Sequence, residues 1–572
     1  MKTHVWALLI LISLGLACTE SDLRSSDDRM IDPAVLDGIF SDFAGSNGPG
    51  CAFAVSQAGQ VIVTRAYGSA NLEHDIQNTP ETVFEPGSVS KQFTAAATIL
   101  LALDGEISLD DDIRDYLPEI PDYGQMITIR HLLNHTSGLR DWGSIAGIGG
   151  WPRTTRVHTH GHMIDIASRQ RALNYPPGQY YSYTNTGYNL QAVLIERVTG
   201  QTFEDFSQER IFQPLGMTKT QWRDDFNEIV QDRAVAYRHN GDGSWSQLMP
   251  FENVHGNGGL LTTVGDLLKF THNLDTGATV GGTEFVAQMH QQGVLNSGRE
   301  IDYASGLRIG EYKGVREVQH SGSTAGYRGH LMRFPDQEIA VSVMCNAASA
   351  NVTAARLAYS VADLYLENTI DEQMVPIAGI ELPTDKLRSF TGRYRHTRTN
   401  TALEIGLFDG ILILQESNFG MGESVGTPLT PVSETRLEAS ALGATIEFEN
   451  TSPGQRASAT YTMGGDAVRL DPVDGFAPTV AELAGYVGTY HSDEAEVTYT
   501  IAVRDGALAI LDRYDRGQTL EPIYLDAFSA RAEIVMAGAL GTITFRRDDS
   551  GRIDGLSVSQ GRVWDLRFER LQ

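Results

Sequence analysis

The segment Glu85-Pro86-Gly87-Ser88-Val89-Ser90-Lys91-Gln92-Phe93 continues without a break into Thr94-Ala95-Ala96-Ala97-Thr98-Ile99-Leu100-Leu101. The alanine- and leucine-rich continuation predicts a buried helix, and Pro86-Gly87 marks the point where the chain enters it. Ser88 then lies at the helix start, where free backbone N–H groups favour negative charge on an oxygen atom. Lys91 follows three residues later on the same face, so its amine can reach the Ser88 hydroxyl.

Ser88 and Lys91 together have the side chains that an activated serine nucleophile requires. A serine hydroxyl is a weak nucleophile until a base takes its proton, and a lysine kept neutral by burial can be that base. The Ser-x-x-Lys spacing is weak evidence alone. The chain has only six lysines, however, and Lys91 is the one with a serine three residues before it.

Two later segments carry polar side chains suited to the same chemistry. Tyr183 and Asn185 are two residues apart in Pro176–Tyr188, so in an extended chain they project to one side. The phenol can relay a proton to a leaving group, and the amide can hold Lys91 and a substrate carbonyl. In the strand expected around Val318–Gly326, His320 and Gly322 face one way. Because Gly322 has no side chain, a substrate can pair with the strand backbone.

These three elements, in this order, resemble the penicillin-recognising serine hydrolases. The closest branch contains class C β-lactamases, DD-peptidases, D-aminopeptidases and related esterases. Arg130–Leu139 is similar to that branch's cleft-bordering loop, and Gly256–Leu267 is similar to its glycine-rich helix entry. The resemblance covers residues 30–370 and implies an α/β (α+β) catalytic domain with a central antiparallel sheet flanked by helices.

The resemblance also implies a role for each matching residue. It makes Ser88 the nucleophile, Lys91 its activator and Tyr183 the general base and acid; whether Lys91 or Tyr183 removes the serine proton stays open. It assigns substrate binding to Asn185, His320, Gly322 and Ser323, with the backbone N–H groups of Ser88 and Ser323 forming the oxyanion hole. No metal or other cofactor is expected.

His320 departs from the residue found at this position in one branch of the family, and this difference narrows the expected function. Class C β-lactamases carry lysine there, and a histidine is only partly charged at neutral pH, so it should attract a β-lactam carboxylate less strongly. The resemblance has histidine there in DD-peptidases and D-aminopeptidases. We therefore expect a serine hydrolase acting on small amide or peptide substrates, of D-aminopeptidase or DD-carboxypeptidase type. A carboxylesterase, a weak β-lactamase and a penicillin-binding sensor without turnover remain open alternatives.

The chain after Pro376 changes to short alternating runs separated by turn residues, and it repeats. Leu387-x-x-Phe390-x-Gly392-x-Tyr394 recurs 96 residues later as Leu483-x-x-Tyr486-x-Gly488-x-Tyr490. We predict a catalytic domain over 19–375 and two small all-β, lipocalin-like antiparallel barrels over 376–475 and 476–572, joined near 471–475. The resemblance to D-aminopeptidase architecture implies that a loop of this tail reaches the active site.

The amino terminus predicts export from a bacterial cytoplasm. Residues 1–18 have a lysine, a short uncharged stretch and small residues before Cys18, which is too short to span a membrane and is typical of a signal peptide. The ending at Cys18 resembles a lipobox, so we expect a periplasmic or envelope-anchored lipoprotein. Ordinary secretion is the alternative. Membrane association is expected only through a lipid at Cys18.

Cys51 and Cys345 both lie in apolar, strand-like runs. The residues alone favour two separate buried thiols over a disulfide. The resemblance places the two strands side by side, and on that basis we hypothesise that the two sulfur atoms are close.

Charge and histidine spacing exclude other classes. A net charge of −28, with no basic cluster, argues against nucleic-acid binding. His158, His160 and His162 alternate like metal ligands on a strand, but a helical continuation would spread them, so we expect exposed histidines and no metal. His135 is expected to be a hydrogen-bonded loop residue rather than a catalyst.

Overall fold

The computed structural model describes residues 31–43, 48–153, 156–349, 353–367, 369, 379–416, 426–439, 442–449, 456–463, 466–511, 517–530 and 541–571. The predicted leader over 1–18, including Cys18, lies outside the described residues. In the part of the chain that is described, no helix combines the length and the apolar composition needed to cross a membrane.

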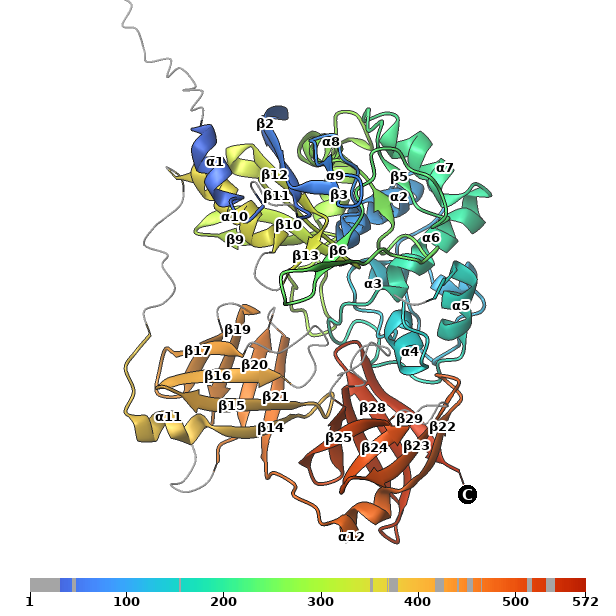
Figure 1. Ribbon diagram of the computed structural model, residues 1–572. Coiled ribbons are helices and arrows are strands. Elements are labelled where there is room, and N and C mark those ends of the chain that lie inside the picture. The colour runs from blue at the N-terminus through green and yellow to red at the C-terminus, as the bar shows by residue number, and fades with distance from the viewer. Residues whose placement is uncertain are drawn as a thin grey trace, which may run out of the picture.

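A six-stranded antiparallel sheet forms the centre of the catalytic domain (Figure 1), as the resemblance implied. Its strand order is β2-β1-β12-β11-β10-β9. The first strand of this sheet along the chain, β1, therefore pairs with the last, β12, which joins the two ends of the domain inside one sheet. The strands are β1 (Cys51–Gln57), β2 (Gln60–Tyr67), β9 (Arg308–Tyr312), β10 (Val315–Thr324), β11 (Tyr327–Phe334) and β12 (Ile339–Cys345).

Helices cover both faces of this sheet because alternate residues of each strand point in opposite directions. Ala52 and Ala54 of β1 pack into the core that contains α2 (Lys91–Leu103) and α8 (Val264–Thr276). Phe53 and Val55 pack on the other face, with α1 (Pro33–Ile39) and α10 (Ala354–Leu366).

A helical region lies beside the sheet and completes the catalytic domain. Its helices are α3 (Ile129–Leu133), α4 (Trp142–Ile148), α5 (His160–Ser168), α6 (Thr186–Thr199) and α7 (Phe203–Ser207), followed by a π-helical turn over Gln208–Phe212. The remaining elements are α9 (Gly282–His290), short 3-10 turns over Gly87–Ser90, Ile113–Asp115 and Pro335–Gln337, and the short strands β3 (Ser69–Asn71), β4 (Ile76–Gln77), β5 (Gln221–Trp222), β6 (Tyr237–His239), β7 (Trp245–Gln247), β8 (Leu260–Leu261) and β13 (Ala347–Ala348).

Cys51 and Cys345 form a disulfide bond across the β1–β12 pair. The two residues are direct partners in the antiparallel register, with their α-carbons 3.9 Å apart. The hypothesis that the sulfur atoms are close is confirmed, and the preference for two separate thiols was wrong. Sequence separation hid the pairing, since the two cysteines are 294 positions apart along the chain.

Two closed antiparallel barrels of eight strands each follow the catalytic domain. A short helix precedes each barrel, α11 (Thr384–Phe390) for the first and α12 (Val480–Leu483) for the second. The first barrel comprises β14 (Gly392–His396), β15 (Ala402–Phe408), β16 (Ile411–Glu416), β17 (Thr427–Pro431), β18 (Arg436–Ala439), β19 (Ala444–Phe448), β20 (Ala459–Met463) and β21 (Asp466–Val473). The second comprises β22 (Gly488–Ser492), β23 (Val497–Arg504), β24 (Ala507–Leu511), β25 (Gly517–Tyr524), β26 (Ala527–Ala530), β27 (Gly541–Arg547), β28 (Ile553–Gln560) and β29 (Val563–Arg570).

The sequence repeat corresponds to a repeated structural device. The Tyr394 hydroxyl donates to the carbonyl of Phe390 at 3.0 Å, and the Tyr490 hydroxyl donates to the carbonyl of Tyr486 at 2.8 Å. Each buried tyrosine thus ties its first barrel strand to the short helical segment before it. The predicted joint was placed too early, because Asp471–Val473 still belong to β21 and the connection begins after them.

Both barrels contact the catalytic domain, and the second lies against its helical region (Figure 1). Arg140, just before α4, donates to Glu494 of the second barrel at 2.5 Å in a buried ion pair. The Arg398 guanidinium of the first barrel lies 3.7 Å from the centre of the Tyr180 ring. The Tyr524 hydroxyl joins the barrels by donating to the first barrel at 2.6 Å.

Loss of the disulfide should lower the stability of the catalytic domain. Replacing Cys51 and Cys345 together by serine should cost about 2–4 kcal/mol of unfolding free energy, since the bond closes a long loop. Thermal unfolding with and without reductant checks this. Reductant should lower the Tm of the wild type to that of the double variant and leave the Tm of the variant unchanged. A wild-type Tm that does not change with reductant would contradict the prediction.

Candidate active site

Ser88 lies in a 3-10 turn, Gly87–Ser90, that leads directly into α2. The expected buried helix with Ser88 at its start is confirmed. Ser88 is half-buried, whereas its neighbours in the turn are buried, so its hydroxyl is the accessible group. Gly87 has a φ of +57°, a conformation that glycine adopts without strain.

The Lys91 amine is fully buried and has three polar neighbours. Its Nζ atom lies 2.7 Å from the Asn257 carbonyl, 3.0 Å from Asn185 Oδ1 and 3.2 Å from Ser88 Oγ. A neutral amine has two N–H bonds and one lone pair. With the two N–H groups donated to Asn257 and Asn185, the lone pair faces the Ser88 hydroxyl and can accept its proton.

The electrostatics favour that neutral form. Burial lowers the pKa of Lys91 well below its ordinary value, and the guanidinium groups of Arg562 and Arg153 lower it further. Asp141 and Glu252 act in the opposite direction without reversing the shift. The residue therefore has the properties of a base in the resting site.

Tyr183 completes this group from the other side. The Lys91 Nζ atom lies 4.9 Å from the centre of the Tyr183 ring. Burial raises the pKa of Tyr183 to about 12, while Arg562 and Ser88 oppose the rise. The phenol is therefore protonated at neutral pH and can supply a proton. The sequence-predicted residues Ser88, Lys91, Tyr183 and Asn185 all meet at one place.

Strand β10 has one free edge beside the catalytic turn. It pairs with β11 over Val318–Thr324, but with β9 only over Val315–Gln319, so its last residues have no β9 partner. A substrate strand can pair with that open edge. A Cβ added to Gly87 would lie 2.5 Å from the Ser323 nitrogen, and one added to Gly322 would lie 2.7 Å from the Ser88 nitrogen. The two amide groups proposed as the oxyanion hole thus flank the junction of strand and turn.

Gly322 and His320 also make contacts within the protein that the sequence did not predict. A Cβ on Gly322 would lie 1.8 Å from the Pro86 carbonyl oxygen, so glycine is required for packing of β10 against the turn. His320 is buried, with Nδ1 2.7 Å from the Ser321 carbonyl and Nε2 3.0 Å from the Tyr303 hydroxyl. Burial lowers its pKa to about 3, so it is neutral. Both ring nitrogens of His320 are therefore engaged within the protein, which leaves the strand backbone as the group available to a substrate.

His135 is the hydrogen-bonded loop residue that we expected. Its carbonyl accepts a hydrogen bond from the Ser182 nitrogen at 2.9 Å, and its Nδ1 accepts one from the Thr184 nitrogen at 3.3 Å. Its ring packs 4.2 Å from the Tyr183 ring. These contacts hold Tyr183 in place from both sides along the chain.

The sequence reasoning missed Arg562 and Asp141. Arg562 lies in the β28–β29 hairpin of the second barrel, and its guanidinium is 4.8 Å from the centre of the Tyr183 ring. Its carbonyl accepts from the Asp141 nitrogen at 3.2 Å, which anchors the hairpin at the start of α4. Within the described residues, no carboxylate forms an ion pair with its guanidinium. A loop of the tail therefore reaches the site, as the resemblance implied, but no local pattern identified the residue.

Asp141 caps α4 and holds Asn185 in position. One oxygen accepts from the Ser144 nitrogen at 2.9 Å and the other from the Asn185 nitrogen at 2.8 Å. Burial opposes its ionisation, but Arg562 and these backbone groups outweigh burial and lower its pKa. Asp141 thus provides a fixed negative charge behind the catalytic residues.

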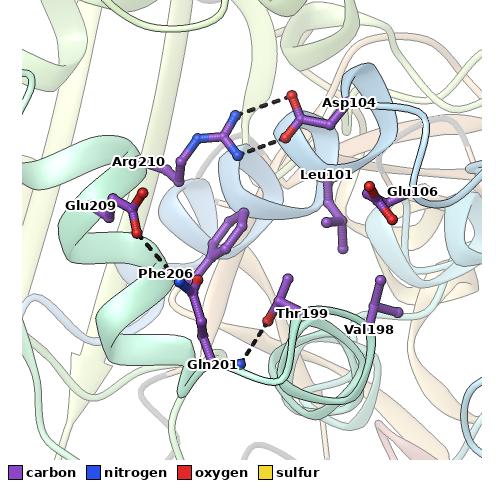
Figure 2. A pocket seen from close by; sticks show the side chains of 9 residues that line it. All are labelled: Leu101, Asp104, Glu106, Val198, Thr199, Gln201, Phe206, Glu209 and Arg210. Atoms are coloured by element: carbon purple, nitrogen blue, oxygen red, sulfur yellow. Dashed lines mark hydrogen bonds and ion pairs between the residues drawn. The ribbon is translucent and has the colours of Figure 1, made fainter.

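A surface hollow at the far end of α2 is unrelated to this chemistry (Figure 2). It lies between Leu101, Val198 and Phe206, and an Arg210–Asp104 ion pair borders it. Leu101 is ten residues beyond Lys91, about 15 Å along a helix. The residues that line the hollow include neither serine nor cysteine.

Comparison with known proteins agrees with this geometry. Residues 36–366 match the model of the β-lactamase family, which is more than half of the chain. The chain belongs to the β-lactamase family. It is a serine hydrolase and a member of the penicillin-recognising superfamily.

Similarity extends beyond the family domain. The D-aminopeptidase of Gluconobacter oxydans (strain 621H) is 26% identical over 548 residues, covering 92% of this chain and 96% of that protein. Penicillin-binding protein 4* of Bacillus subtilis (strain 168) is 26% identical and covers 72% of this chain and 92% of its own length. The structure of the octameric penicillin-binding protein homologue from Pyrococcus abyssi has the same fold, with a TM-score of 0.55, 24% identity, and coverage of 77% of this chain and all of that one.

The pH dependence of this β-lactamase-family enzyme should report the electrostatic effect of Arg562 on the pKa of Lys91. Replacing Arg562 by methionine removes a positive charge that lowers the Lys91 pKa, so that pKa should rise. Activity requires neutral Lys91, and the acid limb of the kcat/KM profile should therefore move to higher pH. His320 is not expected to contribute in this range, since its pKa is about 3.

The matched control is Arg562→Lys, which keeps the charge. Its acid limb should stay near that of the wild type. Coincident profiles for the wild type and Arg562→Met would contradict the assignment.

Proposed function

We propose that the protein is an exported bacterial amidase or peptidase that acts on D-configured, peptidoglycan-like substrates through an acyl-enzyme at Ser88. The observation that carries the proposal is the similarity to a D-aminopeptidase over 92% of the chain, with both barrels included. The grouping of Ser88, Lys91, Tyr183 and Asn185 supports the acyl-transfer mechanism.

In the first step, neutral Lys91 takes the Ser88 proton as the oxygen attacks the substrate carbonyl carbon. The carbonyl π electrons move onto oxygen, and the backbone N–H groups of Ser88 and Ser323 stabilise that charge. Asn185 orients Lys91 through its side-chain oxygen. The low polarity around a fully buried Lys91 strengthens each of these interactions.

In the second step, Tyr183 gives its proton to the leaving nitrogen as the carbon–nitrogen bond breaks. Its raised pKa keeps it protonated until then. Lys91, now charged, can return a proton to the phenolate. Water then attacks the ester carbon at Ser88, and the same groups move its protons in the reverse order. This step releases the carboxylic acid and restores the Ser88 hydroxyl.

Arg562 favours one substrate type within this class. An unpaired guanidinium beside Tyr183 attracts a carboxylate and repels a free ammonium. A D-aminopeptidase substrate carries a free amino group, whereas a DD-peptidase substrate ends in a carboxylate. We therefore favour a DD-peptidase-like preference over a D-aminopeptidase preference, on the scaffold that the two activities share.

Export is supported by two independent features. The leader over 1–18 is typical of a signal peptide, and the ending at Cys18 supports a lipid anchor at the cell envelope. The Cys51–Cys345 bond supports an oxidising compartment such as the periplasm, since cytosolic disulfides are rare.

A substrate panel tests the reaction class. It comprises an N-acyl-D-Ala-D-Ala peptide, D- and L-alanine p-nitroanilides, nitrocefin and short acyl esters. We expect turnover of D-configured amides and a loss on the order of 10⁶-fold in kcat with Ser88→Ala. Turnover of esters alone would favour the carboxylesterase. A single burst without turnover would favour the penicillin-binding sensor. Full activity in Ser88→Ala would overturn the mechanism.

A second comparison tests the preference that we assign to Arg562. With Arg562→Met, kcat/KM for the carboxylate-bearing peptide should fall about tenfold relative to that for D-alanine p-nitroanilide, because a charge-assisted hydrogen bond contributes about 1.5–3 kcal/mol. Both substrates are measured on the pH plateau of each variant. An unchanged ratio would remove Arg562 from substrate selection.

A further inference from the structure

Three side chains with metal-binding atoms meet outside the catalytic group. His160 begins α5, Glu196 lies in the last part of α6, and His255 precedes the glycine-rich loop at Gly256–Gly259. One ring nitrogen of each histidine and one carboxylate oxygen of Glu196 all lie within 4.8 Å of one another. Their spacing along the chain did not connect them, because the three residues lie far apart in sequence.

His255 is the least satisfied member of this cluster. Its side chain is 5% exposed, and neither ring nitrogen has a hydrogen-bond partner. Its ring stacks on Phe203 at 5.6 Å and lies 6.1 Å from the Trp222 ring. Burying an imidazole whose nitrogens have no hydrogen-bond partner costs folding free energy, and a cation bound at this place would give the ring a partner.

The other two residues are oriented by the backbone around them. His160 Nε2 meets the backbone of His255 twice: it lies 3.0 Å from the His255 carbonyl, and the His255 nitrogen donates to it at 3.3 Å. A metal-binding His160 takes the tautomer in which Nε2 carries the proton and donates it to the carbonyl. Nδ1 is then left with the lone pair that a metal needs. This is the usual arrangement of a ligating histidine, whose second nitrogen donates to a carbonyl or carboxylate. Glu196 accepts from the Phe203 nitrogen at 3.3 Å through Oε1, which leaves its second oxygen available.

We propose that His160, Glu196 and His255 form a binding site for a divalent transition-metal ion, with Zn²⁺ as the preferred ion. Two imidazoles and one carboxylate are a typical zinc ligand set, whereas Ca²⁺ and Mg²⁺ prefer oxygen ligands throughout. Bond lengths of about 2.0–2.1 Å place tetrahedral ligand atoms about 3.3 Å apart. The three atoms lie within 4.8 Å of one another, so binding requires them to move closer, and half-buried Glu196 has the most room to do so. Water would take the fourth position.

The ion would stabilise the loop that holds Lys91. The carbonyl of Gly256 accepts from Thr94 of α2 at 2.7 Å, and the carbonyl of Asn257 accepts from Lys91 at 2.7 Å. Asn189 of α6 donates to the His255 carbonyl, also at 2.7 Å. A metal bound to His255 would add a link from this loop to α5 and α6. Its role is structural, and it takes no part in acyl transfer.

Zinc titration of the purified full chain tests the site. The protein is treated with chelator and dialysed, ZnCl2 is added in a calorimeter, and metal content is measured by mass spectrometry. We expect one Zn²⁺ per chain and a rise of several degrees in Tm, with no such rise for MgCl2 or CaCl2. Glu196→Gln and His160→Gln should lose both effects.

The matched control is His162→Gln, two residues from His160 on the same helix start. Its Nδ1 accepts from the Thr159 nitrogen, and glutamine can replace it in that capping position. This variant should bind zinc like the wild type. The metal-free Tm of each variant shows whether it folds, and isosteric Glu196→Gln should keep it. Absence of binding in the wild type, or equal binding in all variants, would overturn the proposal.

Discussion

The buried Lys91 amine is the constraint on which the active site depends. An amine with no access to water needs protein partners, and those of Lys91 come from three separate segments: Ser88, Asn185 and Asn257. The fold must therefore bring the catalytic turn, the start of α6 and the glycine-rich loop to one point. The buried Glu85–Arg223 pair serves the same end, since Glu85 also accepts from the Gly259 nitrogen at 3.1 Å and fixes the loop beside the turn. Glycine is needed where backbones come this close.

The second barrel contributes residues to the border of the active site. Arg140 and Glu494 form an ion pair that is almost fully buried, and Arg140 also donates to the carbonyls of Trp564 and Asp565 at 3.1 Å. Buried ion pairs add little net stability, but they tolerate few alternative geometries. The pair thus sets the orientation of the barrel, and the barrel in turn sets the position of Arg562 over Tyr183.

Short-range features of this protein could be predicted from sequence, because their physics is local. The Ser88–Lys91 spacing on one helix face and the repeated barrel motif ending in Tyr394 and Tyr490 are of this kind. Arg562, the Cys51–Cys345 bond and the His160–Glu196–His255 cluster depend on residues that lie 36 (His160 to Glu196) to 421 (Asp141 to Arg562) positions apart along the chain. The resemblance to a known family supplied part of that long-range information. It did not reveal that His320 uses both ring nitrogens internally, since that depends on where Tyr303 lies.

Burial acts in opposite directions on the two proton-transfer groups. It disfavours charge in both, so it lowers the pKa of Lys91 and raises that of Tyr183 to about 12. One environment therefore produces a neutral base next to a protonated acid. Arg562 lowers both pKa values, which makes Lys91 more fully neutral and Tyr183 a better proton donor to the leaving group. In the mechanism that we propose, a single charge from the barrel therefore acts on both proton-transfer groups, which links the hairpin to the chemistry at Ser88.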